Sequence, residues 1–159
     1  MRLLAIIALL ACAGCVNRYV VPPDAPTATV IFSSETEPVM VQAFADRKCG
    51  RNPAGNRVAY FYKDLFDQRT GTAKPVVAGR EFVFTFHSRE DSGNSVRNCT
   101  VTKAFVPEAG QTYRAHFHPV PAGCNVAVTR GAAPSADSTA ASPVEVVAVV
   151  PECFNSIDG

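Results

Sequence analysis

The chain has no excess of charge of either sign and no long apolar run. Its 15 Lys and Arg residues are balanced by 14 Asp and Glu residues, so the formal net charge is +1. Nucleic-acid-binding proteins normally carry a basic excess or a basic stripe, so we expect no nucleic-acid partner. The apolar run at residues 3–11 is shorter than the ~20 residues that a membrane-spanning helix needs.

Several motifs that carry chemistry are also missing. No C-x-x-C pair marks a zinc ribbon or a redox site, and no G-x-S-x-G elbow presents a nucleophilic serine. No phosphate-binding or dinucleotide-binding glycine pattern occurs. Neighbouring carboxylates, such as Glu35 with Glu37 and Glu90 with Asp91, lie among Ser, Pro and Gly, which is typical of solvated turns. The sequence therefore predicts a protein that is not an enzyme, with no catalytic residues and no cofactor.

What is present begins with the first fifteen residues, MRLLAIIALLACAGC. One basic residue, Arg2, precedes the apolar run, and two small residues precede Cys15. The stretch resembles the lipobox signal of bacterial lipoproteins, in which Leu, a small residue and Gly or Ala precede the cysteine. Cys12 stands where that pattern usually has Leu. The resemblance implies that residues 1–14 are a signal peptide and that Cys15 becomes the lipidated N-terminus.

Two alternatives to this assignment stay open. The lipobox could end at Cys12, or the segment could be an ordinary secretory signal cut near Gly14. Lipidation at Cys15 implies that the N-terminal lipid attaches the protein to a membrane of the bacterial envelope. Val16 follows the cysteine where Asp would be the inner-membrane retention signal of enteric bacteria. The resemblance therefore implies an outer-membrane lipoprotein facing the periplasm, with cell-surface exposure or a soluble periplasmic protein as alternatives.

Cysteine parity favours Cys15 over Cys12 as the lipidated residue. If Cys12 leaves with the signal and Cys15 carries lipid, an even set of four remains, namely Cys49, Cys99, Cys124 and Cys153. The compartment beyond the inner membrane is oxidising, so we expect two disulfides. Four cysteines allow three connectivities, which the spacing alone does not separate.

Short runs of β-forming residues separated by turn residues make up the rest of the chain. The runs are 29–33, 39–45, 57–62, 81–88, 99–106, 112–118, 125–130 and 144–150. Three of them alternate with a period of two and place one apolar set on one face: Phe82, Phe84 and Phe86; Tyr113, Ala115 and Phe117; Val126 and Val128. This pattern predicts a single all-β domain, an antiparallel β-sandwich of about seven or eight short strands, with a small β-barrel as the alternative.

The sequence also predicts how these runs are connected. Residues 16–27 contain three prolines and no helical period, so we expect residues 15–27 to be an extended tether and residues 28–159 to be the folded domain. Residues 131–143 are small, polar and proline-bearing, and we expect a mobile loop there. Residues 63–70 could form one helical turn.

A hairpin loop is expected at residues 107–110, between two of the predicted strands. It would bring Cys99 close to Cys124, within the ~7 Å between Cα atoms that a disulfide allows. We therefore predict a Cys99–Cys124 disulfide. A Cys49–Cys153 disulfide would then attach the C-terminal tail to an early strand.

The segment AGQTYRAHF at residues 109–117 resembles a hairpin layout of several small uncharacterised envelope lipoproteins. The chain is also similar to the small β-barrel lipoprotein inhibitors of lysozyme, whose signature residues it lacks. Neither resemblance assigns a function to a residue of this chain.

The three histidines are weak candidates for a metal site. His116 and His118 lie two apart on a predicted strand, so both imidazoles would point to one face. His87 lies on the polar face of its own predicted strand and could be a third ligand. We prefer the simpler interpretation, in which all three are solvent-facing polar residues, and we predict no metal.

Tyr60, Phe61 and Tyr62 form an uninterrupted aromatic run, so at least one ring must face away from the core. We expect these rings to be covered, either because the strand is buried on both faces or because a loop lies over the outer ring. The alternative is an exposed ring that anchors a partner or a glycan.

These observations favour a non-enzymatic, lipid-anchored envelope protein that acts on another protein or on the peptidoglycan cell wall. A metal-binding protein or metal-dependent enzyme that uses His116, His118 and His87 is the first alternative. An inhibitor of a hydrolase, with residues 108–110 or 131–143 as the contact, is the second.

Overall fold

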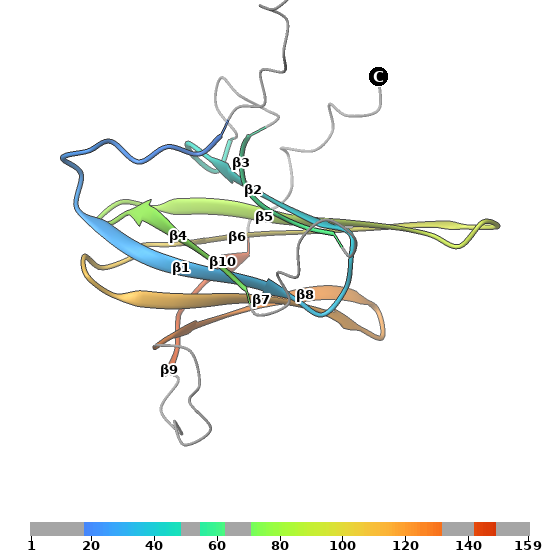
Figure 1. Ribbon diagram of the computed structural model, residues 1–159. Coiled ribbons are helices and arrows are strands. Elements are labelled where there is room, and N and C mark those ends of the chain that lie inside the picture. The colour runs from blue at the N-terminus through green and yellow to red at the C-terminus, as the bar shows by residue number, and fades with distance from the viewer. Residues whose placement is uncertain (1–17, 49–54, 63–70, 132–141, 149–159) are drawn as a thin grey trace, which may run out of the picture.

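The computed structural model describes residues 18–48, 55–62, 71–131 and 142–148, and these form two packed β-sheets without a helix (Figure 1). The strands are β1 (Thr27–Ser34), β2 (Val39–Phe44), β3 (Asn56–Phe61), β4 (Thr72–Val77), β5 (Phe82–Asp91), β6 (Val96–Phe105), β7 (Thr112–Val120), β8 (Gly123–Arg130), β9 (Ser142–Pro143) and β10 (Val147–Ala148). The predicted all-β sandwich is therefore confirmed. Within these residues, nothing has the helical length and apolar character needed to cross a membrane.

Each sheet has five strands. One has the order β4-β1-β7-β8-β9 and the other the order β10-β6-β5-β2-β3. All pairs within the sheets are antiparallel except β1 with β7, which run parallel from Thr29 opposite Thr112 to Ser34 opposite Phe117. The antiparallel prediction fails at this pair because β1 and β7 are joined through strands of the other sheet, and such long connections permit parallel pairing.

The core lies between the two sheets and is built from alternate residues of the strands, as predicted. Phe32 of β1 packs against the aromatic set of the opposite sheet, with ring centroids 5.8 Å from Phe84 and 6.0 Å from Phe86. The face of β7 that carries Tyr113, Ala115 and Phe117 and the face of β8 that carries Val126 and Val128 are buried in the same cluster. Burial of this apolar surface, at roughly 25 cal/mol per Å² of area, is what holds the sheets together.

The edge strand β4 was not expected from the sequence. Its central residue, Pro75, lies opposite Thr29 of β1, and proline has no backbone N–H to donate to a neighbouring strand. A proline at a position paired on both sides would leave a backbone hydrogen bond unmade, and β4 is the terminal strand of its sheet, with one neighbour only among the described strands. Pro75 is thus the reason that the sequence did not predict a strand here, and its lack of an N–H agrees with the position of β4 at the edge.

The hairpin expected at residues 107–110 does not exist. β6 and β7 belong to different sheets, and the segment between them crosses from one sheet to the other. Gly79 donates its N–H to the carbonyl of Pro107 at 2.8 Å, and Gly110 donates to Thr27 at 2.8 Å. Because these bonds attach the segment to the turn before β5 and to the start of β1, it acts as a fixed connection between the layers.

The longest hairpin is instead formed by β5 and β6, which pair from Phe82 opposite Phe105 to Asp91 opposite Val96. It extends beyond the rest of the sandwich on the right of Figure 1. The sequence placed the ends of these strands at residues 88 and 99 because the charged and polar residues beyond them have no apolar alternation. Those residues pair through their backbones nonetheless.

The folded part of the chain begins earlier than residue 28. Arg18 forms a parallel bridge with Arg57 of β3, and the Tyr19 N–H donates to the Arg57 carbonyl at 3.2 Å. The Tyr19 ring packs edge-on against Phe82, with centroids 5.7 Å apart, and its hydroxyl accepts a bond from the Val77 N–H at 3.3 Å. Part of the expected tether is therefore attached to the sandwich.

The expected loop at residues 131–143 is described only at its ends. Gly131 donates its N–H to the Thr112 carbonyl at 3.0 Å, and Ser142 and Pro143 pair with β8 as strand β9. Residues 132–141 and 63–70, including the expected helical turn, lie outside the described residues.

Candidate functional site

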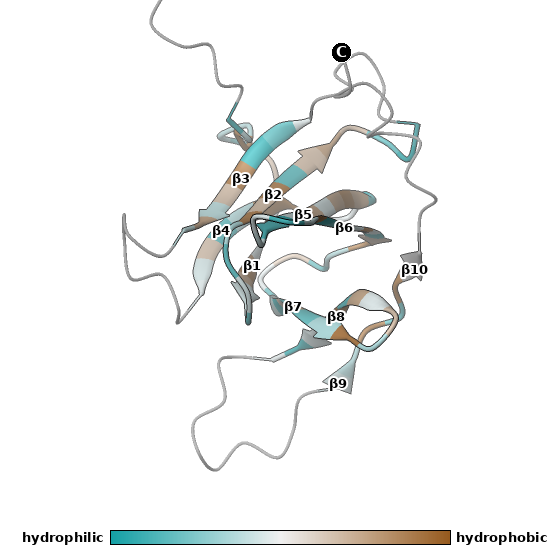
Figure 2. Ribbon diagram, turned by 90° about the vertical axis from the view of Figure 1, so that its right-hand side faces the viewer, coloured by the Kyte–Doolittle hydropathy of each residue, from teal (hydrophilic) through white to brown (hydrophobic). Residues whose placement is uncertain are grey.

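The edge strands of the two sheets, β3 and β4, lie on the same side of the sandwich (Figure 2). Residues of both strands line a groove of about 520 Å³. Its walls come from three segments that are distant in the sequence: residues 18–21, β3 together with Tyr62, and residues 72–75 of β4. A concave site of this size can hold a small molecule or a headgroup.

Two parallel tyrosine rings form the most exposed aromatic surface of the groove. The rings of Tyr60 and Tyr62 have centroids 6.0 Å apart and planes 7° apart, and the residues are 43% and 40% exposed. Phe61 between them is buried in the core. The expectation that these rings are covered was therefore wrong for both tyrosines, because β3 is an edge strand and its outer side chains have no neighbouring strand.

In the described part of the chain, the charged residues that line the groove are all basic. They are Arg18, Arg57 and Lys74, and no described Asp or Glu lines it. None of the three forms an ion pair with another residue of the described ranges. Sequence reasoning missed this cluster because its members lie on three separate segments, and only the aromatic run at residues 60–62 pointed to the place.

The three histidines do not come together. His116 and His118 lie on the same face of β7 with stacked rings, their centroids 5.9 Å apart, as the strand period predicted. His87 lies on β5 in the other sheet, where its Nδ1 is 2.8 Å from the Thr100 hydroxyl. Within the described part of the chain, no group of three or more His, Cys, Asp or Glu residues is placed to hold a metal ion.

His116 instead bridges two side chains of the first strand. Its Nδ1 is 2.9 Å from the Ser33 hydroxyl, and its Nε2 is 3.0 Å from a Glu35 carboxylate oxygen. The residue types match those of a Ser-His-acid catalytic triad, in which the serine must reach the substrate. Ser33 is only 6% exposed, however, and the groove is lined by none of the three residues. This arrangement fits a structural link across the parallel β1–β7 pair.

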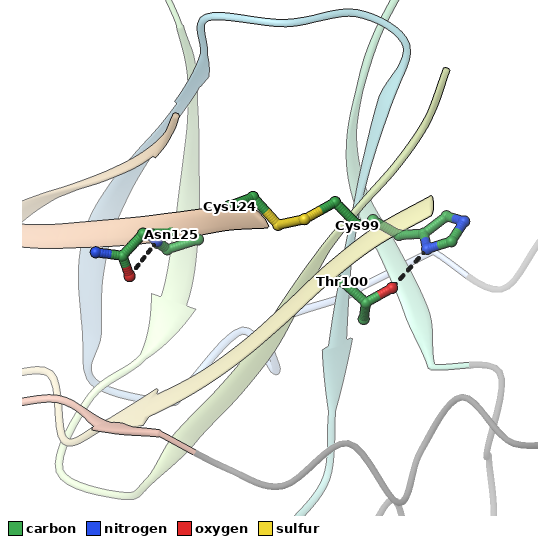
Figure 3. The surroundings of a disulfide bond; sticks show 6 residues. Cys99, Thr100, Cys124 and Asn125 are labelled. Carbon is green, nitrogen blue, oxygen red and sulfur yellow. Dashed lines mark hydrogen bonds between the residues drawn. A yellow bond between two sulfur atoms is a disulfide. The ribbon is translucent and has the colours of Figure 1, made fainter. Parts of the chain in front are cut away.

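The predicted Cys99–Cys124 disulfide is present (Figure 3). Cys99 lies on β6 and Cys124 on β8, with Cα atoms 6.2 Å apart, so the bond joins the two sheets. The sequence predicted this disulfide from a β6–β7 hairpin, which the structure does not contain. The two cysteines meet instead because β6 and β8 face each other across the sandwich at this end. The bond lies where the β5–β6 hairpin leaves the sandwich.

Other predicted sites fall outside the described residues or have local partners. Cys15, Cys49 and Cys153 lie outside, so the lipidation and the Cys49–Cys153 disulfide stay predictions. Glu108, from the segment expected to contact a hydrolase, forms an ion pair with Arg130.

The comparisons with known proteins add no family or relative. No family model, no curated protein and no solved structure matches the chain. The function must therefore be argued from the surfaces described above.

Proposed function

We propose that this protein is a non-enzymatic, lipid-anchored binding protein of the bacterial envelope, and that the projecting β5–β6 hairpin is its contact with another envelope protein. The observation that carries the proposal is the length of this hairpin relative to its neighbours. Hairpins and loops that extend from a rigid scaffold are where binding residues concentrate.

The outer part of the hairpin has no neighbouring strand among the described residues. β2 pairs with β5 only as far as Ser88, and β10 pairs with β6 only at Lys103 and Ala104. Residues 89–91 and 96–98 therefore pair only with each other. A two-stranded ribbon is marginally stable in water on its own, so a partner strand or surface would stabilise it.

The side chains of this segment suit a protein surface. Arg89, Glu90, Asp91 and Arg97 carry charges of both signs, and Val96 is half exposed. A mixed set of charges around one apolar residue favours a partner with its own mixed polar surface over a uniform polyanion. The disulfide at the base of the hairpin fixes the direction in which it leaves the sandwich.

The test uses the register of the hairpin. Arg89 lies directly opposite Asn98, so residues 90–97 can be replaced by Asn-Gly, a two-residue loop that closes such pairs. A photo-crosslinking residue at position 94 of the full-length lipoprotein should give a discrete adduct with an envelope protein, and the same residue at exposed position 111 should not. The variant with residues 90–97 replaced by Asn-Gly should compete poorly with the crosslinking protein for that partner, and its midpoint of urea unfolding should equal that of the wild type.

Two results would contradict the proposal. One is the absence of any adduct at position 94, and the other is an adduct that the shortened protein displaces as well as the wild type does. An adduct with peptidoglycan alone would move the contact from a protein to the cell wall.

A further inference from the structure

We infer that the groove between β3 and β4 binds the headgroups of the membrane that holds the lipid anchor, so that this edge of the sandwich lies against the bilayer surface. The inference rests on the proposed lipidation at Cys15. It assigns to one surface three features that the hairpin contact does not use: the short distance to the anchor, the cations that form no ion pair within the described ranges, and the exposed tyrosines.

The distance follows from covalent geometry. Only two residues lie between Cys15 and Arg18, so three Cα-to-Cα steps join them, and at most about 3.6 Å per step gives roughly 11 Å in all. Arg18 itself is bridged to Arg57 in the wall of the groove. With Cys15 lipidated at the membrane surface, the groove is therefore held within about one to two Debye lengths of the headgroups.

The charge of the groove complements such a surface. Arg18, Arg57 and Lys74 line it, and none of the lining residues that the structure describes is a carboxylate. A basic residue close to an anionic leaflet contributes roughly 1 kcal/mol of binding, which is about five-fold in affinity. Three such residues would add an electrostatic contribution to the membrane attachment that the lipid provides.

Three of the exposed large apolar side chains lie in the groove or beside it. Tyr60 and Tyr62 line the groove, and Val20, which is 78% exposed, lies in the segment that borders it. Tyrosine is enriched at the level of the headgroups because its ring is apolar and its hydroxyl is polar. An anchored protein that left these side chains in water would keep this apolar surface exposed beside the bilayer.

An added peptide strand fits the groove less well. At β3, the Arg57 carbonyl already accepts the Tyr19 N–H, so this edge is partly occupied. At β4, Pro75 has no N–H to donate. Both walls therefore offer side chains more than backbone groups, and side chains are what headgroup phosphates and glycerol would contact.

Because the chain contains no tryptophan, a single introduced Trp reports its own depth. Tyr62→Trp and Val96→Trp variants of the lipidated protein would be placed in vesicles of phosphatidylethanolamine and phosphatidylglycerol that contain lipids brominated near the headgroup. We expect quenching of Trp fluorescence in the Tyr62→Trp variant and much less in the Val96→Trp variant at the hairpin tip. Equal quenching, or none at position 62, would overturn the inference.

A second measurement separates the groove from the anchor. A Cys15→Ser variant, exported behind a cleavable secretory signal, carries no lipid and can be co-sedimented with the same vesicles. Arg57→Gln and Lys74→Gln should each lower its partition coefficient about five-fold at low salt, whereas Arg89→Gln on the hairpin should not. Equal urea midpoints would exclude misfolding of the variants. Equal partition coefficients for the Cys15→Ser protein and its three glutamine variants would overturn the inference.

The outcomes distinguish the two proposals. Mass analysis of the wild-type N-terminus decides the anchor: an unmodified Cys15 would contradict the lipoprotein assignment whatever the groove binds. A lipidated Cys15 with an unquenched Trp at position 62 would leave the anchor in place and refute the groove. If the Trp of the Tyr62→Trp variant were shielded from solvent by purified cell wall and not by vesicles, the membrane role of the groove would also be refuted.

Discussion

His87 is a single residue whose ionisation the fold alters in a testable way. Its half-buried imidazole lies on β5 beside Thr100, and burial lowers its pKa below the ordinary value of about 6.5, with the positive charge of Arg89 lowering the pKa further. The folded protein therefore binds this proton less readily than the unfolded chain. Well above a pH of about 6.5 the imidazole is neutral in both states and its ionisation does not affect stability.

Below that pH the unfolded chain takes up the proton first, so the free energy of unfolding should fall as the pH falls towards the lowered pKa of His87. An NMR titration should give a pKa for His87 below 6.5. In an Arg89→Gln variant the pKa of His87 should move part of the way back up, because burial is the larger cause and stays. A His87 pKa at or above the ordinary value in the wild type would refute this account.

Two buried threonines offer a test of polar pairing at the same scale. Thr85 and Thr102 lie on neighbouring strands, are nearly inaccessible to water, and have hydroxyl oxygens 2.8 Å apart. Thr85→Val would leave the Thr102 hydroxyl buried without this partner, and we expect a loss of about 1–3 kcal/mol in the free energy of unfolding. The double valine variant should recover most of that loss, because neither hydroxyl then remains. Additive losses in urea unfolding would contradict this interpretation.

At the scale of elements, the Cys99–Cys124 bond joins the two sheets across a sequence separation of 25 residues. In the chain-entropy model, closing a loop of that length stabilises a protein by about 3–4 kcal/mol. Replacing both cysteines with alanine should lower the free energy of unfolding by about that amount in urea denaturation of oxidised protein. The single Cys124→Ala variant should lose as much as the double variant, since either change removes the bond. A loss below about 1 kcal/mol would show that the packed sheets already hold this end together.

How far the sequence predicts these elements depends on whether local or distant neighbours decide them. The inward faces of β5, β7 and β8 follow from alternation, because a period of two directly encodes which side chains meet the core. The strand β4 could not be predicted in this way. Its Pro75 suits an edge strand, and which strand lies at an edge depends on the topology of the whole sheet. The prediction of a β6–β7 hairpin was wrong for the same reason. The sequence of a short connection does not show whether the two strands pair with each other or lie in opposite sheets.

The candidate groove shows the same limit. Its tyrosines lie two residues apart in one aromatic run and could be found as a sequence pattern, although their exposure could not. Its cations could not be found, because Arg18, Arg57 and Lys74 are brought together only when two edge strands and the N-terminal segment meet. A site assembled from three segments has no spacing to detect.

For the whole molecule, the position of the proposed lipid anchor is the decisive feature. Because Arg18 and Tyr19 are attached to β3, only two residues separate Cys15 from the folded domain, far fewer than the expected tether. A full-length Cys15→Ala variant should leave the detergent phase in a phase-partition experiment and bind envelope membranes more weakly, because it lacks the lipid that the sequence predicts at this residue. Matched expression of a Cys12→Ala variant, which should stay lipidated, is the control. Retention of the Cys15→Ala variant in the membrane with loss of the Cys12→Ala variant would assign the lipid to Cys12.

The disulfide between the sheets also bears on what happens when an envelope protease cuts the chain. The segment that crosses between β6 and β7 lies within the covalent ring closed by Cys99 and Cys124, and Val106, Glu108 and Gly110 within it are exposed. A cut there would leave the two halves of the protein joined through sulfur. The C-terminal strands β7 and β8 would thus stay attached to the N-terminal half. If Cys15 carries the proposed lipid, a nicked molecule would be retained at the cell until a reductant released the C-terminal strands.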